Sequence, residues 1–254
     1  MTSETAASVV ELKQDGDVLL VTINNPPVNA LGAAVRQGLA AAMEQADASA
    51  EVKAVLIVGQ GKAFIAGADI REFGKPPVAP FLPDVCNRIE ACSKPVVAVI
   101  HGAALGGGLE IAMAAHYRLA LPAAKLGLPE VSLGLIPGAG GTQRAPRLMG
   151  VKAAAELMLS GKPLSAKAAQ AAGLVDKLEE GTDPVAAGMA YIRELLAQDA
   201  PVRATSADQS QLADKAAAHA ELEALRADTV KKSRGLFSPL KIIEAVRAAV
   251  ELPF

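Results

Sequence analysis

Two isolated carboxylates lie within residues 100–144, a stretch rich in glycine and apolar side chains. Glu110 is followed only by apolar residues up to His116, and Glu130 lies in the apolar segment LGLPEV. A glutamate in such surroundings is rare unless it is paired or functional. The simpler alternative for Glu110 is a helix-capping role. Two carboxylates beside one ligand suit proton transfer to and from a substrate, and we therefore predict acid–base chemistry here.

Glycines accompany both carboxylates. The run at residues 106–108 permits positive φ and close approach of a ligand to the backbone. Residues 109–115 favour a helix, whose first N–H groups would point at one spot and form an anion or oxyanion site. A second glycine turn, PGAGGTQR at residues 137–144, lacks the Lys-Ser or Lys-Thr of a nucleotide-triphosphate loop. It is interpreted as a wall of the same pocket, with the Gly138 N–H available to a ligand.

Strand and helix patterns alternate in the first part of the chain and predict an α/β fold. Expected strands cover residues 18–23, 52–58, 95–100 and 117–121, and expected helices cover residues 30–48, 84–91 and 109–115. Small residues in the loop at 62–71 leave backbone on which a ligand could lie. Beyond residue 151 the expected elements are helices, at residues 152–159, 166–172, 185–196, 209–232 and 239–252. We predict an α/β core at residues 1–190 and a C-terminal helical region at 191–254.

Composition excludes several classes of protein. With 254 residues, 51% of them hydrophobic, the chain can form one large domain or a domain with an appendage. A net charge of −2 argues against a nucleic-acid-binding or membrane-binding surface. Cys86 and Cys92 lack metal-ligand spacing, so we expect reduced, structural thiols and no metal site. No secretion signal and no transmembrane stretch is expected, which favours a cytoplasmic protein.

Four motifs occur in an order typical of one family: FIAGADI at 64–70, HGAALGGGLE at 101–110, GLPE at 127–130 and PGAGGTQR at 137–144. Over about residues 9–190 the chain resembles the enoyl-CoA hydratase/isomerase (crotonase) superfamily. The resemblance implies a crotonase-like spiral of ββα units, with an acyl-CoA thioester as ligand and no cofactor besides the coenzyme A of the substrate. It implies an oxyanion hole made by the N–H groups of Ala68 and Gly107. The substrate-binding residues that it implies are Ala66, Ala68, Asp69, Ile70, Arg71, Gly107 and Gly138.

Both glutamates match the hydratase pattern of this family. The resemblance implies that Glu110 takes a proton from water as it attacks Cβ, that Glu130 delivers a proton to Cα, and that Gly138 helps to hold the water. The expected reaction is hydration of trans-2-enoyl-CoA to 3-hydroxyacyl-CoA in fatty-acid β-oxidation. A helix N-terminus would keep Glu110 ionised, and apolar surroundings would raise the pKa of Glu130. His101 and His116 are expected to be structural, because no acid or nucleophile lies near them in the sequence.

Two alternatives to hydration stay open. One is isomerisation of a β,γ-enoyl thioester to the α,β form, since the same pair of acids can move a proton between carbons. The other is a non-catalytic acyl-CoA-binding or RNA-associated relative, against which the near-neutral charge and the two glutamates argue. An assay of hydration separates the second alternative from an enzyme.

A finer resemblance concerns the segments IHG at 100–102, HYR at 116–118 and SPLKIIEAV at 238–246. They are similar to the hydratase half of bifunctional β-oxidation enzymes, in which a 3-hydroxyacyl-CoA dehydrogenase half follows. That half is absent from these 254 residues, which fits a part of a longer protein as well as a single-domain protein. We predict that residues 239–252 pack on the chain's own core near the CoA pocket, with an Ile and Val stripe buried. Helices at this end also permit a homo-oligomer.

Overall fold

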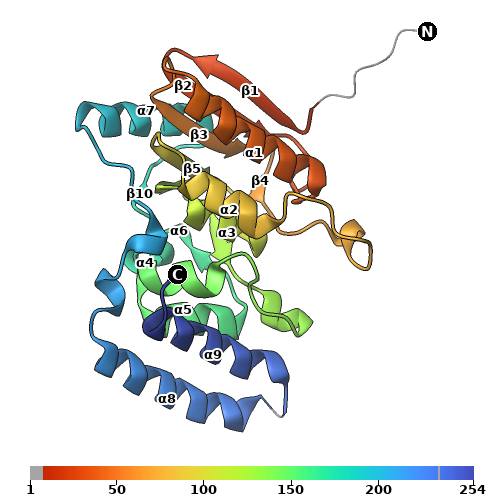
Figure 1. Cartoon of the computed structure of the whole chain (residues 1–254), viewed down its shortest axis with the longest axis vertical. Helices are drawn as coiled ribbons and strands as arrows, with labels where there is room; N and C mark the ends of the chain where they lie inside the picture. Colours follow the sequence, from red (N-terminus) through yellow and green to blue (C-terminus); the bar gives the residue numbers. More distant parts are fainter. Residues whose placement is uncertain (1–7, 234) are drawn as a thin grey trace.

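The computed structural model describes residues 8–233 and 235–254 (Figure 1). The predicted lack of a secretion signal rests partly on residues 1–7, which lie outside the described residues. Two sheets form, with strand orders β1-β2-β3-β5-β7-β10 and β4-β6-β8-β9. The strands are β1 Val10–Asp15, β2 Val18–Ile23, β3 Ala54–Gly59, β4 Ala63–Ile65, β5 Val96–Ile100, β6 Ala103–Leu105, β7 Tyr117–Ala120, β8 Lys125–Gly127, β9 Leu164–Ser165 and β10 Lys177–Leu178.

The middle of the chain repeats one unit, in which the first strand joins the large sheet and the second joins the small sheet. β3 and β4 are followed by helix α2, and β5 and β6 are followed by helix α3. β7 and β8 repeat the pattern and lead into the short 3-10 helix η2. Successive units pair in parallel in both sheets. The expected spiral of ββα units in an α/β fold is therefore confirmed.

The central strands β3 and β5 are built from glycine and aliphatic residues, most of them β-branched, and all their residues are buried. Such continuous apolar runs are typical of parallel strands that are covered on both faces. Helix α1 packs Val35, Leu39 and Met43 on one face, and α7 packs Met189 and Ile192 on the other. β1 is an antiparallel edge strand with mostly exposed side chains, and the sequence patterns did not predict it.

The α-helices are α1 Ala33–Ala48, α2 Leu82–Glu90, α3 Gly107–Ala114, α4 Gly141–Met149, α5 Val151–Ser160, α6 Ala166–Ala171, α7 Pro184–Ala197, α8 Lys215–Lys232 and α9 Phe237–Glu251. Short 3-10 helices are η1 Ile70–Glu72, η2 Glu130–Leu133, η3 Thr205–Ala207 and η4 Ser210–Leu212. The prediction of one continuous helix over residues 209–232 was wrong, because Asp214 caps the start of α8 by accepting a hydrogen bond from the Ala217 N–H. The boundary expected at residue 190 falls inside α7, and the division into two regions stays a prediction.

Helices α8 and α9 lie side by side at the end of the molecule opposite β1 (Figure 1). α9 packs on α4 and α5 and buries Ile242, Ile243 and Val246. The Gln143 side chain joins α4 to α9 through a 2.8 Å hydrogen bond from its Nε2 to the Ala245 carbonyl. The predicted packing of this apolar stripe on the chain's own core is confirmed. Among the described residues, no helix is both long enough and apolar enough to span a membrane.

Candidate active site

Three turns leave the same edge of the small sheet. β4, β6 and β8 are parallel neighbours, so their carboxyl ends lie together. The turn with Ala68 follows β4, the turn with Gly107 follows β6, and Glu130 comes shortly after β8. A Cβ placed on Gly67 would lie 3.5 Å from the Leu105 carbonyl oxygen, which shows how closely the first two turns approach. The sheet therefore gathers residues that are far apart in the sequence.

The turn before α3 requires glycine for reasons of space. Gly106 has φ 53°, and a Cβ there would lie 3.1 Å from Glu130 Oε1. A Cβ on Gly107 would lie 2.6 Å from the Leu82 side chain and 3.0 Å from that of Leu31. Leu31 and Leu82 also line a pocket with Ala68, so the predicted oxyanion residues share two apolar neighbours.

Glu110 lies in the first turn of α3 and is only 2% exposed. Its Oε1 accepts hydrogen bonds from the Ala139 N–H at 2.7 Å and the Gly141 N–H at 2.8 Å. Burial raises the pKa of Glu110 above its ordinary value, and the two N–H donors and the charge of Arg144 lower it by less. Desolvation thus outweighs the helix N-terminus and the donors in their effect on this pKa, and the expectation that Glu110 stays ionised remains a prediction.

Glu130 begins η2, and its Oε2 is buried without a hydrogen-bond partner among the described residues. Burial raises the pKa of Glu130 to about 7, and the negative charge of Glu110 contributes to the rise. This agrees with the expected effect of apolar surroundings. A carboxyl group with such a pKa exchanges protons readily near neutral pH.

The residues expected along the CoA are arranged around one ion pair. Arg71 Nη2 lies 2.7 Å from Asp69 Oδ2, and these bonds lower the pKa of Asp69 to about 2. Asp69 is buried, whereas Arg71 and Ile70 are exposed and Ala66 is half-buried. The segment thus presents a cation and an apolar side chain to solvent at the rim of the site.

Gly138 is exposed in the second glycine turn. The N–H groups of its neighbours Ala139 and Gly141, rather than its own, bind Glu110. A role of Gly138 in holding water stays a prediction. The turn lies against Glu110 through these two hydrogen bonds, and its role as a wall of the ligand pocket stays a prediction.

One part of the site was missed by the sequence reasoning. Arg144 is buried in α4 and pairs with Glu90 at the end of α2, with 2.8 Å between Nη2 and Oε2. The two residues are 54 positions apart, and no local pattern joins them. The visible signal was a single charge at the end of the motif PGAGGTQR.

His116 is structural, as expected. Its Nδ1 accepts a hydrogen bond from the Val96 N–H at 2.9 Å, and its Nε2 lies 3.0 Å from the Glu90 carbonyl oxygen. Cys86 and Cys92 are both free and buried, and burial raises the pKa of each thiol. Within residues 8–233 and 235–254, no cluster of three metal-ligating His, Cys, Asp or Glu side chains occurs.

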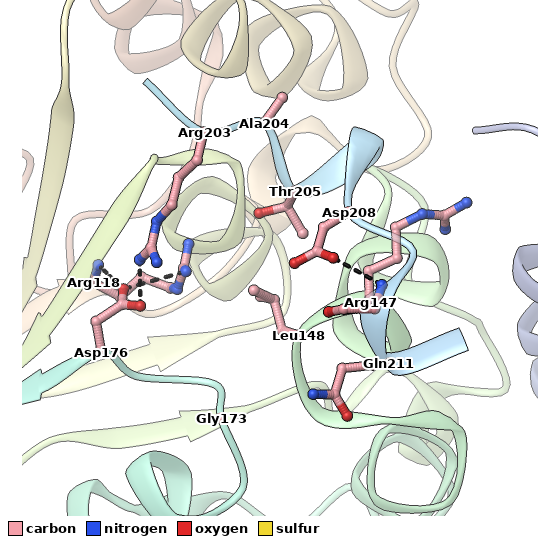
Figure 2. A pocket seen from close by; sticks show the side chains of 11 residues that line it. Arg118, Arg147, Leu148, Gly173, Asp176, Arg203, Ala204, Thr205, Asp208 and Gln211 are labelled. Atoms are coloured by element: carbon pink, nitrogen blue, oxygen red, sulfur yellow. Dashed lines mark hydrogen bonds and ion pairs between the residues drawn. The ribbon is translucent and has the colours of Figure 1, made fainter. Parts of the chain in front are cut away.

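A separate pocket lies near the far end of α3 and is lined by several arginines (Figure 2). Asp176 pairs there with the buried Arg118, at 3.2 Å, and with Arg203. Arg118 also donates hydrogen bonds to the carbonyls of Ala115 and Leu174. Because the charges of Asp176, Arg118 and Arg203 satisfy one another, we interpret these three residues as structural. Arg147, which also lines the pocket, has Nε and Nη2 buried without a hydrogen-bond partner among the described residues.

Comparisons with known proteins agree with this geometry. The family model described as Enoyl-CoA hydratase/isomerase matches residues 13–239. The peroxisomal bifunctional enzyme of Danio rerio is 45% identical over 93% of this chain, which spans 32% of that relative. A probable enoyl-CoA hydratase of Bacillus subtilis (strain 168) is 46% identical over 66% of the chain and 68% of the relative. The structure of enoyl-CoA hydratase from Mycobacterium tuberculosis H37Rv has a TM-score of 0.69 at 30% identity, covering 96% of this chain and 89% of that one. The resemblance drawn from the motifs is confirmed.

Proposed function

Because the chain belongs to the enoyl-CoA hydratase/isomerase family, we propose that it hydrates trans-2-enoyl-CoA to 3-hydroxyacyl-CoA in fatty-acid β-oxidation. One observation carries the proposal. The carboxyl of Glu130 lies over Gly106, the residue that caps α3, and Glu110 occupies the first turn of the same helix. The charge of Glu110 also contributes to the raised pKa of Glu130, which supports the proposal that both acids act on one substrate.

In the proposed reaction the two acids have different tasks. Glu110 is held through Oε1, and among the described residues no donor binds its Oε2, which is the oxygen suited to accept a proton from water. The water oxygen bonds to Cβ while the electron pair of the double bond moves toward the thioester carbonyl. Glu130 then protonates Cα, so that H and OH have been added to the substrate.

The developing charge on the thioester oxygen needs donors that are already in place. We assign this task to the N–H groups of Ala68 and Gly107, which leave adjacent parallel strands. Oriented donors of this kind stabilise a transition state by about 2.7 to 4 kcal/mol each. A thioester oxygen found out of hydrogen-bond reach of both groups in a ligand complex would contradict the assignment.

The rim is proposed to bind the rest of the substrate. The exposed guanidinium of Arg71 suits a phosphate group of CoA, while Ala66, Asp69, Ile70 and Gly138 complete the substrate-binding residues. No separate cofactor enters this scheme, because coenzyme A arrives with the substrate. A cytoplasmic location and a homo-oligomer remain proposals, and the Danio rerio relative has a peroxisomal name.

Isotope incorporation tests the reaction directly. The protein is incubated in ¹⁸O-labelled water with a chain-length series of trans-2-enoyl-CoA thioesters, and the products are analysed by mass spectrometry. Hydration requires a 3-hydroxyacyl product with one ¹⁸O at Cβ. An unchanged substrate across the series would reject the proposal and favour a non-catalytic acyl-CoA-binding protein.

Isomerisation is a second candidate, favoured by the raised pKa of Glu130, since a carboxyl near pKa 7 can take a proton from one carbon and return it to another. The test uses a 3-enoyl-CoA thioester in the same labelled water. An isomerase gives the 2-enoyl product without ¹⁸O, and a bifunctional site gives the labelled hydroxy product after it.

A further inference from the structure

We propose that Arg144, paired with Glu90, is a positioning residue for Glu110, acting through the glycine turn that separates the two side chains. The proposal rests on the proposed function, in which Glu110 is the base. It adds two residues, Arg144 and Glu90, that do not themselves take part in the proton transfers. Its support is the packing of the turn, the hydrogen bonds behind it and the distribution of charge around Glu110.

The turn at Gly140 and Gly141 is enclosed from two sides. A Cβ on Gly141 would lie 2.9 Å from Glu110 Oε1, and a Cβ on Gly140 would lie 2.3 Å from Arg144 Nη1. The Glu110 carboxylate and the Arg144 guanidinium therefore pack closely against adjacent residues of the same turn. Arg144 Nη1 also donates to the Ala139 carbonyl at 3.4 Å, while the Ala139 N–H donates to Glu110. A displacement of Arg144 would remove this hydrogen bond from the turn whose N–H groups bind Glu110.

Arg144 is itself held by α2. Its Nε and Nη2 bind the two carboxylate oxygens of Glu90 at 3.2 and 2.8 Å, and Nη2 also donates to Asn87 Oδ1 at 3.1 Å. Glu90 accepts a further hydrogen bond from the Ser206 N–H at 2.9 Å. The ring of Phe254 lies 4.7 Å from the guanidinium. A forked pair with these contacts fixes the guanidinium in one orientation, which a lysine ammonium would not reproduce.

The charges near Glu110 come from three neighbouring elements. Arg144 is on α4, Glu130 is on η2, and α2 contributes Glu90 and the neutral thiol of Cys86. The charge of Arg144 lowers the pKa of Glu110 against the larger effect of burial. Glu90 carries the opposite charge and lies 2.8 Å from Arg144, so we expect it to offset part of that effect. Arg144→Gln should therefore raise the pKa of Glu110, whereas Glu90→Gln should lower it.

These opposite directions make a test that a merely structural role would not satisfy. In the full chain with ¹³C-carboxyl-labelled glutamate, the Glu110 signal is assigned by its loss in Glu110→Gln and followed by NMR through a pH titration. We expect its midpoint to move upward in Arg144→Gln and downward in Glu90→Gln. The acid limb of the kcat profile should move in the same two directions. Loss of alignment should also lower kcat about tenfold to a hundredfold in Arg144→Gln.

Arg144→Lys separates charge from geometry. It keeps the positive charge and loses the two-pronged guanidinium contact with Glu90, so kcat should fall. The Glu110 titration midpoint should differ less from that of the parent than the midpoint of Arg144→Gln does. If Arg144→Gln does not fold, Glu90→Gln and Arg144→Lys still decide the matter. A Glu90→Gln midpoint that does not move downward then counts against the proposal.

The matched control is Asp176→Asn, which removes one negative charge from a second buried arginine pair (Figure 2). Its partner Arg118 binds the Ala115 carbonyl at the end of α3 opposite Glu110. This variant should lower the melting temperature without moving the Glu110 titration. The proposal would be overturned if the Glu110 titration midpoint were the same in Arg144→Gln, Glu90→Gln and the control. It would also be overturned if the midpoint moved in the same direction in Arg144→Gln and Glu90→Gln. The titration does not require turnover. If the hydration assay fails but the Glu110 midpoints of Arg144→Gln and Glu90→Gln move in opposite directions, the proposed reaction is rejected and the positioning role is kept.

Discussion

Glu110 and Glu130 are the same residue type, yet the fold gives them different surroundings. Glu110 is almost fully buried, receives two backbone N–H bonds and has an arginine behind the turn that binds it. Glu130 is half-buried, and one of its oxygens is buried without a partner among the described residues. Burial raises the pKa of both. Two N–H donors from the turn at residues 139–141 stabilise ionised Glu110, whereas the backbone hydrogen bond that lowers the pKa of Glu130 comes from Glu130 itself. This difference in local hydrogen bonds is the basis on which we propose the roles of base and acid for two chemically identical groups.

The largest expected effect tests whether both acids are needed. Glu110→Gln and Glu130→Gln keep side-chain size and remove the ionisable group, so each should lower kcat for hydration by about 10² to 10⁴. The Kd for CoA should change little, because neither residue is assigned to the CoA moiety. Steady-state kinetics and calorimetric titration with CoA measure the two quantities. Turnover near the parental value in either variant would remove that residue from the mechanism.

A second prediction disturbs the support of Glu110 without altering its chemistry. Gly141→Ala places a Cβ 2.9 Å from Glu110 Oε1 and 2.8 Å from the Pro137 side chain, so the carboxylate or the turn must shift. A displacement of this kind should lower kcat about a hundredfold. The melting temperature is measured alongside to show that α4 persists. Parental kcat in a folded Gly141→Ala protein would mean that the position of the carboxylate tolerates the added methyl group.

A third prediction concerns the pH at which Glu130 acts. As the proposed acid it must be protonated, and its pKa is about 7. We therefore expect kcat/KM for hydration to decrease as pH rises above about 7, where the free enzyme loses this proton. The pH profile of Glu130→Gln, measured on its residual activity, should lack that decrease. A parental profile that stays level up to pH 9 would assign the acid elsewhere.

The smallest expected effect is on stability. The pKa of Glu130 rises from an ordinary 4.5 to about 7 on folding, so between these values the folded state binds more protons than the unfolded state. The contribution of this residue to the free energy of unfolding is then greatest below pH 4.5 and is lost as pH rises through 7. Glu130→Gln has no such dependence. The difference in unfolding free energy, variant minus parent, should increase between pH 4.5 and 7.5 in chemical denaturation.

The fold was predictable where apolar runs are long. Residues 18–23 were expected as a strand and form β2, and the core strands and most helices match within a few residues. β6 and β8 have three residues each, too few to show a period, although the site depends on them. β1 was missed because only its first residue is buried and an edge strand has little hydrophobic pattern.

Glu110 and Glu130 could be singled out for a local reason, since each stands among glycines and apolar residues in the sequence, while their catalytic roles stay a proposal. The Arg144–Glu90 pair was not, because it joins two helices across 54 residues. The net rise in the pKa of Glu110 was not visible in the sequence either. A helix N-terminus is visible in the sequence, whereas the depth at which the fold buries that helix is not.

The parallel pairing of β4 and β6 sets a length scale for the proposed oxyanion hole. Adjacent strands lie about 4.8 Å apart, and an N–H···O hydrogen bond measures about 2.9 Å. We therefore expect the two proposed donors, Ala68 and Gly107, which follow these strand ends, to lie close enough together for both to reach one oxygen. Backbone hydrogen bonds set the spacing between the strands, so this spacing does not depend on which side chains surround the site. Inserting one residue into either turn would shift one donor N–H by about 3.3 Å and move it away from the other donor. No side chain of the proposed site would be removed by the insertion.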